Sequence, residues 1–185
     1  MIGAALPPAA RAVSLVTNGG FEPDFTGWTV MGGQTFIASQ GSIPGYTGLA
    51  AIDGTHYAIF SNDAGIYQDL ATTIGVTYHF TFYIGNGDDG SGRTSSLTAA
   101  FGGQTVFTAT NWGGTPFTFE QFNVVATGTV SRVQFSNTGT HPGYLSLDQV
   151  VVTAPAPEPA TLALFGAGAG IGFLSHRRRK AAARG

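Results

Sequence analysis

The sequence predicts an all-β protein, a sandwich of about ten short antiparallel strands between residues 13 and 153. From Val13 onward, apolar and polar residues alternate with a period of two, which is typical of strands that turn one face to a core. Turn residues interrupt the alternation about every 8–12 residues, and no stretch has the apolar spacing of an amphipathic helix. The 28 glycines also favour many turns over helices.

The clearest strand is Thr77–Ile84, bounded by Gly75 and the loop "GNGDDGSGR". Its core face carries Tyr78, Phe80, Phe82 and Ile84, and its other face carries His79, Thr81 and Tyr83. Trp28 lies in another alternating segment, and we expect it in the core. The remaining predicted strands are Leu15–Thr17, Trp28–Met31, Thr35–Ser39, His56–Ser61, Ile66–Leu70, Ser96–Phe101, Thr105–Ala109, Phe117–Ala126, Arg132–Ser136 and Tyr144–Thr153.

Within Phe117–Ala126 the apolar alternation changes phase. Phe117 and Phe119 share one parity, whereas Phe122 and Val124 share the other. One extra residue near Glu120 and Gln121 would turn all four side chains to a common face, as a β-bulge does. We therefore predict a bulge at this point.

Composition excludes several function classes. Charged residues make up only 10% of the chain, and residues 13–155 hold nine acidic against two basic side chains, a net charge of −7. A domain this acidic has no electrostatic footprint for nucleic acid. The chain has no cysteine, which rules out disulfides, thiolate metal sites and thiol nucleophiles.

The sequence gives little support for catalysis. No G-x-S-x-G nucleophile elbow is present, and the four histidines have neither metal-ligand spacing nor a partner nucleophile. Glycoside hydrolysis needs two carboxylates across a cleft, and nothing in the sequence favours one pair among the acidic residues. We therefore predict a non-enzymatic protein.

Both ends of the chain differ from the predicted sandwich. Residues 1–12 are small and apolar and end in Ala-Arg-Ala, the shape of a signal-peptidase site, so they are interpreted as the remnant of a secretory signal peptide. A frayed terminal tail is the alternative. Residues 154–159 form a Pro/Ala linker, and residues 160–185 form an apolar and basic tail.

The tail has the features of a short membrane-spanning helix. Ala160–Leu174 carries no charge and would extend about 22 Å as a helix, somewhat less than the roughly 30 Å hydrocarbon core of a bilayer. A basic cluster follows at once and would keep the C-terminus in the cytoplasm. Its members are Arg177, Arg178, Arg179 and Lys180. A Gly-rich segment of this length suits transient rather than permanent anchoring.

The order of motifs in this tail resembles the PEP-CTERM sorting signal of Gram-negative bacteria. Pro157, Glu158 and Pro159 are followed by the apolar run "ATLALFGAGAGIGFL" and the basic run "HRRRK". The resemblance implies recognition by an exosortase, a membrane protease-transpeptidase, after transient insertion in the inner membrane. It also implies export to the cell surface or the extracellular matrix of cells that make exopolysaccharide.

Three other segments resemble jelly-roll domains of the carbohydrate-binding-module, galactose-binding-like type: "LVTNGGFEPDFTGWTV", "IYQDLATTIGVTYHFTFYI" and "GYLSLDQVVVT". In such domains an acid after the first strand and one in the last strand commonly share a structural Ca²⁺. Here these positions are Glu22 and Asp148. Calcium needs six to eight oxygen ligands, so other groups would have to complete the site. The alternative is that both are surface or capping carboxylates.

Sugar binding would require exposed aromatic rings, because sugar rings stack their C–H faces on them. Trp112, Tyr46 and Tyr144 lie among turn residues and are the candidates. The alternative is that each packs over a loop beside the core.

We therefore expect an exported, non-enzymatic β-sandwich of the cell envelope or extracellular matrix. One hypothesis gives it a structural or adhesive role in the exopolysaccharide layer. The other makes it a carbohydrate-binding module that recognises exopolysaccharide through exposed aromatic residues.

Overall fold

The computed structural model describes residues 12–39, 49–61, 63–86, 95–112, 114–137 and 144–155, and no side chain is described at positions 95, 111 and 112. The predicted signal remnant, Tyr46, the PEP motif and the predicted membrane helix lie outside these residues. Within them, no helix is long and apolar enough to span a bilayer.

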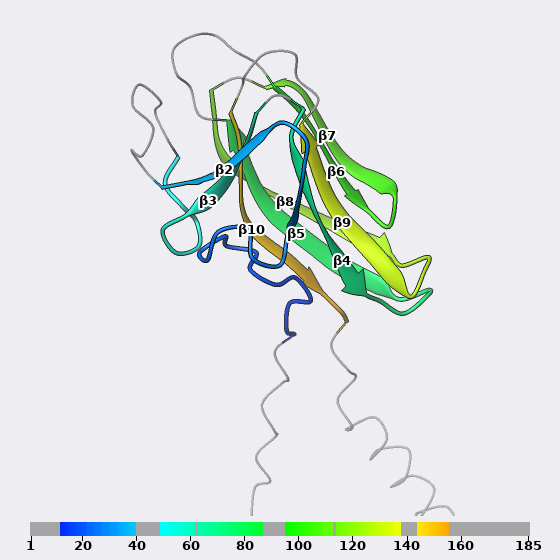
Figure 1. Cartoon of the computed structure of the whole chain (residues 1–185). Helices are drawn as coiled ribbons and strands as arrows, with labels where there is room; N and C mark the ends of the chain where they lie inside the picture. The colour runs from blue at the N-terminus through cyan, green and yellow to red at the C-terminus, as the bar shows by residue number, and fades with distance from the viewer. Residues whose placement is uncertain are drawn as a thin grey trace, which may run out of the picture. The chain divides into compact units, whose positions relative to one another are not determined.

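The described chain forms two five-stranded antiparallel sheets, which confirms the predicted all-β sandwich (Figure 1). The β5 sheet has the order β2-β3-β10-β5-β8 and the β9 sheet has the order β1-β4-β9-β6-β7. The strands of the β5 sheet are β2 (Gln34–Ala38), β3 (Tyr57–Ser61), β10 (Leu145–Thr153), β5 (Thr77–Asn86) and β8 (Thr115–Val125). Those of the β9 sheet are β1 (Thr29–Met31), β4 (Gly65–Ala71), β9 (Val130–Asn137), β6 (Ser95–Phe101) and β7 (Gln104–Trp112).

Aromatic side chains fill the space between the sheets. Phe82 of β5 meets Phe135 of β9 edge-to-face at 5.0 Å between ring centroids, and Phe80 contacts both rings. Trp28 is buried, as predicted, and its indole Nε1 donates to the carbonyl of Asn18 at 2.9 Å. The predicted core face of β5 is confirmed, since all four of its side chains are buried.

The predicted bulge near Glu120 and Gln121 is wrong. β5 and β8 pair without a register shift from Thr77 opposite Val125 to Ile84 opposite Thr118, and the irregularity lies beyond Ile84. Because alternation is uninterrupted, Phe122 and Val124 turn to the core whereas Phe117 and Phe119 turn outward. Glu120 shares the inner side of this edge strand, and its partial burial raises the pKa of its carboxyl.

The predicted strand Leu15–Thr17 is reduced to one bridge, between Ser14 and Thr153, and one backbone–backbone hydrogen bond from Leu15 N–H to the carbonyl of Val152. Asn18, Phe21 and Asp24 follow with φ values of 55°, 58° and 56°, in the left-handed region, far from the φ of a regular strand. This N-terminal segment therefore lies along β10 as a loop (Figure 1), and it brings Glu22 into hydrogen-bonding contact with Thr55, in the loop before β3.

Candidate functional site

The outer face of the β5 sheet presents an ordered set of aromatic and polar side chains on β5 and β8. Because the register is continuous, three residue pairs lie side by side on this face, and they are Tyr83 with Phe119, Thr81 with Gln121, and His79 with Asn123. Phe119, Gln121, Asn123 and His79 are exposed, whereas Tyr83 is half-buried and Thr81 is at the limit of burial. We call these six residues the β5–β8 outer face.

Tyr83 and Phe119 form the aromatic part of this face. Their ring centroids lie 5.1 Å apart with an interplanar angle of 50°. Phe119 is 46% exposed, although a Phe side chain gains most when it is buried. The amides of Gln121 and Asn123 follow on the same strand at two-residue steps and can each donate and accept hydrogen bonds. Apolar rings beside amide groups suit a ligand with C–H faces and hydroxyl groups.

A second aromatic group covers the outer face at β2 and β3. Tyr57 is fully buried there, edge-on to Phe117 at 5.7 Å. Tyr144, a predicted sugar-stacking residue, is half-buried and meets Phe36 edge-on at 6.1 Å. Its ring therefore packs in a local cluster at this place.

The structure does not test the other two predicted stacking residues. Trp112 ends β7, at the edge of the β9 sheet, and its side chain is not among those described. Tyr46 lies outside the described residues. Both remain predictions.

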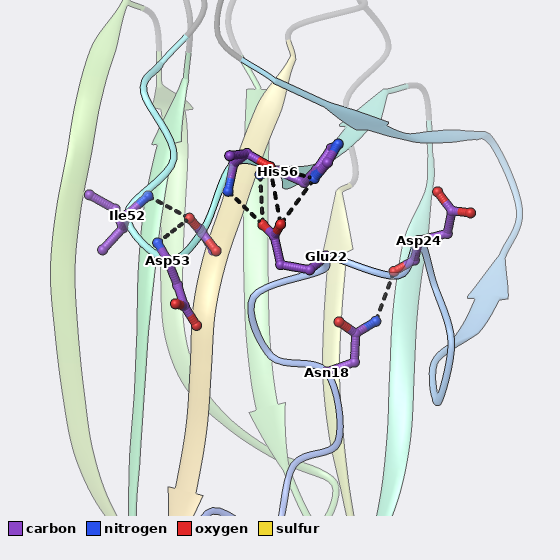
Figure 2. A network of polar contacts seen from close by, with 8 residues as sticks. Asn18, Glu22, Asp24, Ile52, Asp53 and His56 are labelled. Atoms are coloured by element: carbon purple, nitrogen blue, oxygen red, sulfur yellow. Dashed lines mark hydrogen bonds and ion pairs between the residues drawn. The ribbon is translucent and has the colours of Figure 1, made fainter.

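Asp148 of β10 is fully buried and organises the start of the loop 52–56 (Figure 2). Its Oδ2 accepts hydrogen bonds from the backbone N–H of Ile52 at 2.6 Å and of Asp53 at 3.1 Å, and its Oδ1 accepts from Gln149 N–H at 2.6 Å. Burial raises the pKa of Asp148 to about 6, and the negative charge of Asp53 adds to this effect, whereas the three N–H donors oppose it.

Glu22 holds the other end of the same loop (Figure 2). Its Oε1 accepts from the backbone N–H of Thr55 at 2.7 Å and of His56 at 2.8 Å. Its Oε2 lies 3.1 Å from the Thr55 hydroxyl, which donates to it, and 3.2 Å from His56 Nδ1. The backbone donors of His56 and Thr55 lower the pKa of Glu22 to about 2. Gly54 lies between the two anchor points with φ 70°, and a Cβ there would collide with the Glu22 carboxylate.

In the structure Glu22 and Asp148 accept hydrogen bonds from separate sets of donors on the loop 52–56, and a shared calcium ion would have to compete with these donors. Their carboxylate oxygens point at N–H and O–H donors, and calcium requires a shell of oxygen acceptors. Among the residues that the structure describes, no group of three or more His, Asp or Glu could hold a metal. The side chain of Asp53 instead borders a hollow of about 150 Å³ beside Gly20 and Gln149. The calcium site remains a prediction.

Sequence reasoning missed Tyr83 and Phe119 as candidate ligand contacts. A signal was present in the sequence. If no bulge is assumed, every second residue from position 117 to 125 lies on one face, and these residues are Phe117, Phe119, Gln121, Asn123 and Val125. The assumed bulge assigned Phe119 to the core.

Comparison with known proteins identifies the tail and the fold. Residues 155–179 match the PEP-CTERM protein-sorting motif, so the chain carries this motif directly after the sandwich. No match is found among the sequences of characterised proteins.

Solved structures with a similar fold include several carbohydrate-binding modules and the enzymatically active domain of a bacteriophage CBA120 tailspike protein. TmCBM61, solved in complex with β-1,4-galactotriose, superposes with a TM-score of 0.60 and 15% identity over 78% of this chain and all of its own. A family 16 carbohydrate-binding module gives a TM-score of 0.54 and 16% identity over 75% of this chain and 99% of its own. The CBM22-1 and GH10 modules of Clostridium thermocellum Xyn10B, complexed with xylohexaose, give a TM-score of 0.51 and 20% identity. The match covers 77% of this chain and 29% of that structure. At these identities the similarity establishes the jelly-roll fold.

Proposed function

We propose that this chain is an exported carbohydrate-binding protein that binds a polysaccharide on the β5–β8 outer face. The observation that carries the proposal is the pair Tyr83 and Phe119, whose rings lie together on an outer sheet face beside two amide side chains. The rings would stack on the C–H faces of successive sugar units, and Gln121 and Asn123 would bond to their hydroxyl groups.

The charge of the domain favours a neutral polysaccharide. The six residues of the β5–β8 outer face include no Asp, Glu, Lys or Arg, and residues 13–155 carry a net charge of −7. An anionic, uronate-rich chain would be repelled by this domain at low ionic strength. Two structures of similar fold hold β-1,4-galactotriose and xylohexaose, so neutral galactan and xylan are the first ligands to test.

We propose binding without catalysis. The two acids that the chain brings to one loop, Glu22 and Asp148, are acceptors for backbone amides on that loop. This use keeps them from acting as the acid and base of a hydrolase, which must reach a substrate.

The sorting motif supports a cell-surface role. In this proposal an exosortase recognises residues 155–179 while the tail sits in the inner membrane of a Gram-negative cell. The sandwich is then delivered to the cell surface or to the extracellular matrix, where it meets exopolysaccharide.

The proposal is tested by pull-down of the full chain, in mild detergent, with insoluble galactan, xylan and the exopolysaccharide of the producing cells, with alginate as the anionic control. Retention on at least one neutral polysaccharide, and none on alginate, is expected. Failure to bind any of them would favour the second candidate, a structural or adhesive protein without a defined glycan ligand. The sorting motif fits that candidate equally well, because sorting requires no ligand.

Calcium has its own test. The melting temperature of the wild type would be measured with millimolar calcium and with a chelator, and Asp148→Asn would serve as the control. A rise with calcium that Asp148→Asn lacks would support the predicted site at Glu22 and Asp148. Equal melting temperatures would leave both carboxylates as amide acceptors alone.

A further inference from the structure

One end of the sandwich combines exposed apolar side chains with an absence of charge. Two turns meet there: Thr72 N–H donates to the carbonyl of Thr129 at 2.9 Å, and Gly75 N–H donates to that of Ala126 at 2.8 Å. The start of the described chain and the end of β10 lie at the same end, because Ser14 pairs with Thr153 and Thr153 pairs with His79 (Figure 1). We call this region the tail-proximal end.

The apolar side chains at this end are unusually exposed. Eight large hydrophobic residues are exposed in the part of the chain that the structure describes, and five of them lie here. They are Val13 at 81%, Ile74 at 63%, Val130 at 60%, Val125 at 49% and Leu15 at 37% exposed. Gathered exposed apolar residues mark a surface that contacts a protein or a membrane.

The same end is free of formal charge in an otherwise acidic domain. The segments that build it, 12–15, 71–79, 121–131 and 151–155, contain no Asp, Glu, Lys or Arg, whereas residues 13–155 have a net charge of −7. Among the described residues, the charged ones that border these segments are Glu120 and the ion pair of Asp69 with Arg132. Asp63 precedes Gly65, at the opposite end of β4 from Ala71. An anionic lipid surface would repel the rest of the domain and would tolerate this end alone.

The position of the sorting motif in the chain places a membrane near the tail-proximal end. The sorting motif begins at residue 155, and the uncharged run Ala160–Leu174 starts five residues after Pro155. Five residues span at most about 18 Å when fully extended. A membrane that held this run would therefore lie within that reach of Pro155.

We propose that the tail-proximal end is a lipid-contacting surface that rests on the membrane while the sorting tail is inserted. The exposed side chains of Val13, Ile74, Val125 and Val130 enter the interfacial region of the bilayer, where apolar side chains gain from leaving water. The contact orients the domain and keeps the junction at residue 155 next to the bilayer, where a membrane protease works. The proposal rests on the sorting motif and is independent of glycan binding.

The absence of cysteine permits a direct test by single-site labelling. Full-length variants Ile74→Cys, Val130→Cys and, as control, Asp63→Cys would each carry an environment-sensitive fluorophore and be reconstituted in phosphatidylethanolamine–phosphatidylglycerol vesicles. Labels at 74 and 130 are expected to shift to the blue and to be quenched by a lipid-attached quencher, whereas the label at 63 shows neither change. Equal quenching at 74 and 63 would overturn the proposal.

A second variant separates lipid contact from simple tethering. The fluorophore is attached at Val125→Cys in two proteins, one otherwise unchanged and one that also carries Ile74→Ser and Val130→Ser. Circular dichroism checks that both proteins are folded. Loss of quenching in the double variant is expected, because the apolar contact is removed while the tail remains. Unchanged quenching would contradict a specific contact. A blue shift in detergent that grows with protein concentration would show that a second copy covers this end, and would also overturn the proposal.

Discussion

Glu22 and Asp148, two carboxylates far apart in the sequence, fix one loop through its backbone amides. Glu22 accepts the amides of Thr55 and His56, and Asp148 accepts those of Ile52 and Asp53. Charge-assisted hydrogen bonds of this kind are stronger than neutral ones. The loop is therefore held at both ends without secondary structure of its own.

Gly54 provides a test of this arrangement. Gly54→Ala places a Cβ at φ 70° and against the Glu22 carboxylate, so we expect the free energy of unfolding to fall by about 1 kcal/mol more than in a control at the same backbone angle. Gly103→Ala is that control, since φ is 82° and nothing lies within 4 Å of its added Cβ. Urea denaturation measures both. Equal losses would show that the contact with Glu22 does not constrain the loop.

The raised pKa of Asp148 predicts a pH dependence with a definite sign. Its pKa is about 6 in the folded chain against 3.8 for the unperturbed side chain, so the folded state holds the proton more tightly. The stabilising effect of this proton is complete below about pH 4 and is lost as the pH rises through about 6.

Urea denaturation in the presence of a chelator measures the free energy of unfolding of the wild type and of Asp148→Asn at each pH. The quantity of interest is the wild-type value minus the value for Asp148→Asn. This difference should fall by on the order of 2 kcal/mol between about pH 4 and pH 6. The opposite slope would mean that the three backbone donors outweigh burial, and that the carboxylate is the preferred form.

Sequence reasoning selected Glu22 and Asp148 but not their geometry. The resemblance to jelly-roll domains pointed to both residues, because an acid after the first strand and one in the last strand are neighbours in such domains. Their donors are backbone amides of residues 52–56, which have no signature in side-chain chemistry, so spacing alone could not distinguish a cation from N–H groups as their partner.

At the scale of strands, β8 illustrates both the strength and the weakness of pattern reading. Alternation of period two located β5 and β8 closely, because each strand has an apolar face that must be buried. Alternation gave the wrong result at the phase change in β8, because a bulge and an exposed aromatic residue produce the same sequence of apolar and polar residues. Register with β5 decides between them, and register is a tertiary property.

The register makes a prediction about stability. Phe122 stacks on Phe82 at 5.9 Å on the core side, whereas Phe119 is 46% exposed. Phe122→Ala should lower the free energy of unfolding by about 3 kcal/mol, and Phe119→Ala by less than about 1 kcal/mol. Thermal or urea unfolding compares the two variants. A larger loss for Phe119→Ala would restore the bulge and remove Phe119 from the outer face.

At the scale of the whole molecule, the chain combines a β-sandwich with a tail that carries a sorting motif. The sandwich has the jelly-roll fold of carbohydrate-binding modules, and the match at residues 155–179 identifies a sorting motif. Net charge, absence of cysteine and the basic cluster were readable from composition. The proposed ligand face was not, because the β5–β8 outer face arises only where β5 and β8 come together.

Processing at the motif predicts a change of mass. The exported protein, isolated from its native cells, should lack the basic cluster at positions 177–180, because an exosortase would remove it. Intact-mass spectrometry distinguishes the two forms, and cells without the exosortase provide the control. A mature protein that retains the cluster would contradict sorting through this motif.

The central claim is that Tyr83 and Phe119 bind a neutral polysaccharide. The most direct measurement is calorimetric titration of the full chain with the soluble form of the polysaccharide retained in pull-down, using Phe119→Ala, Tyr83→Ala and Tyr67→Ala. Tyr67 is the matched control, because its ring lies under Arg132 at 3.6 Å, on β4 of the other sheet. We expect Phe119→Ala and Tyr83→Ala to weaken binding by about tenfold or more, as for buried aromatic contacts elsewhere, and Tyr67→Ala to bind as the wild type does. Wild-type affinity in Phe119→Ala and Tyr83→Ala would contradict the account.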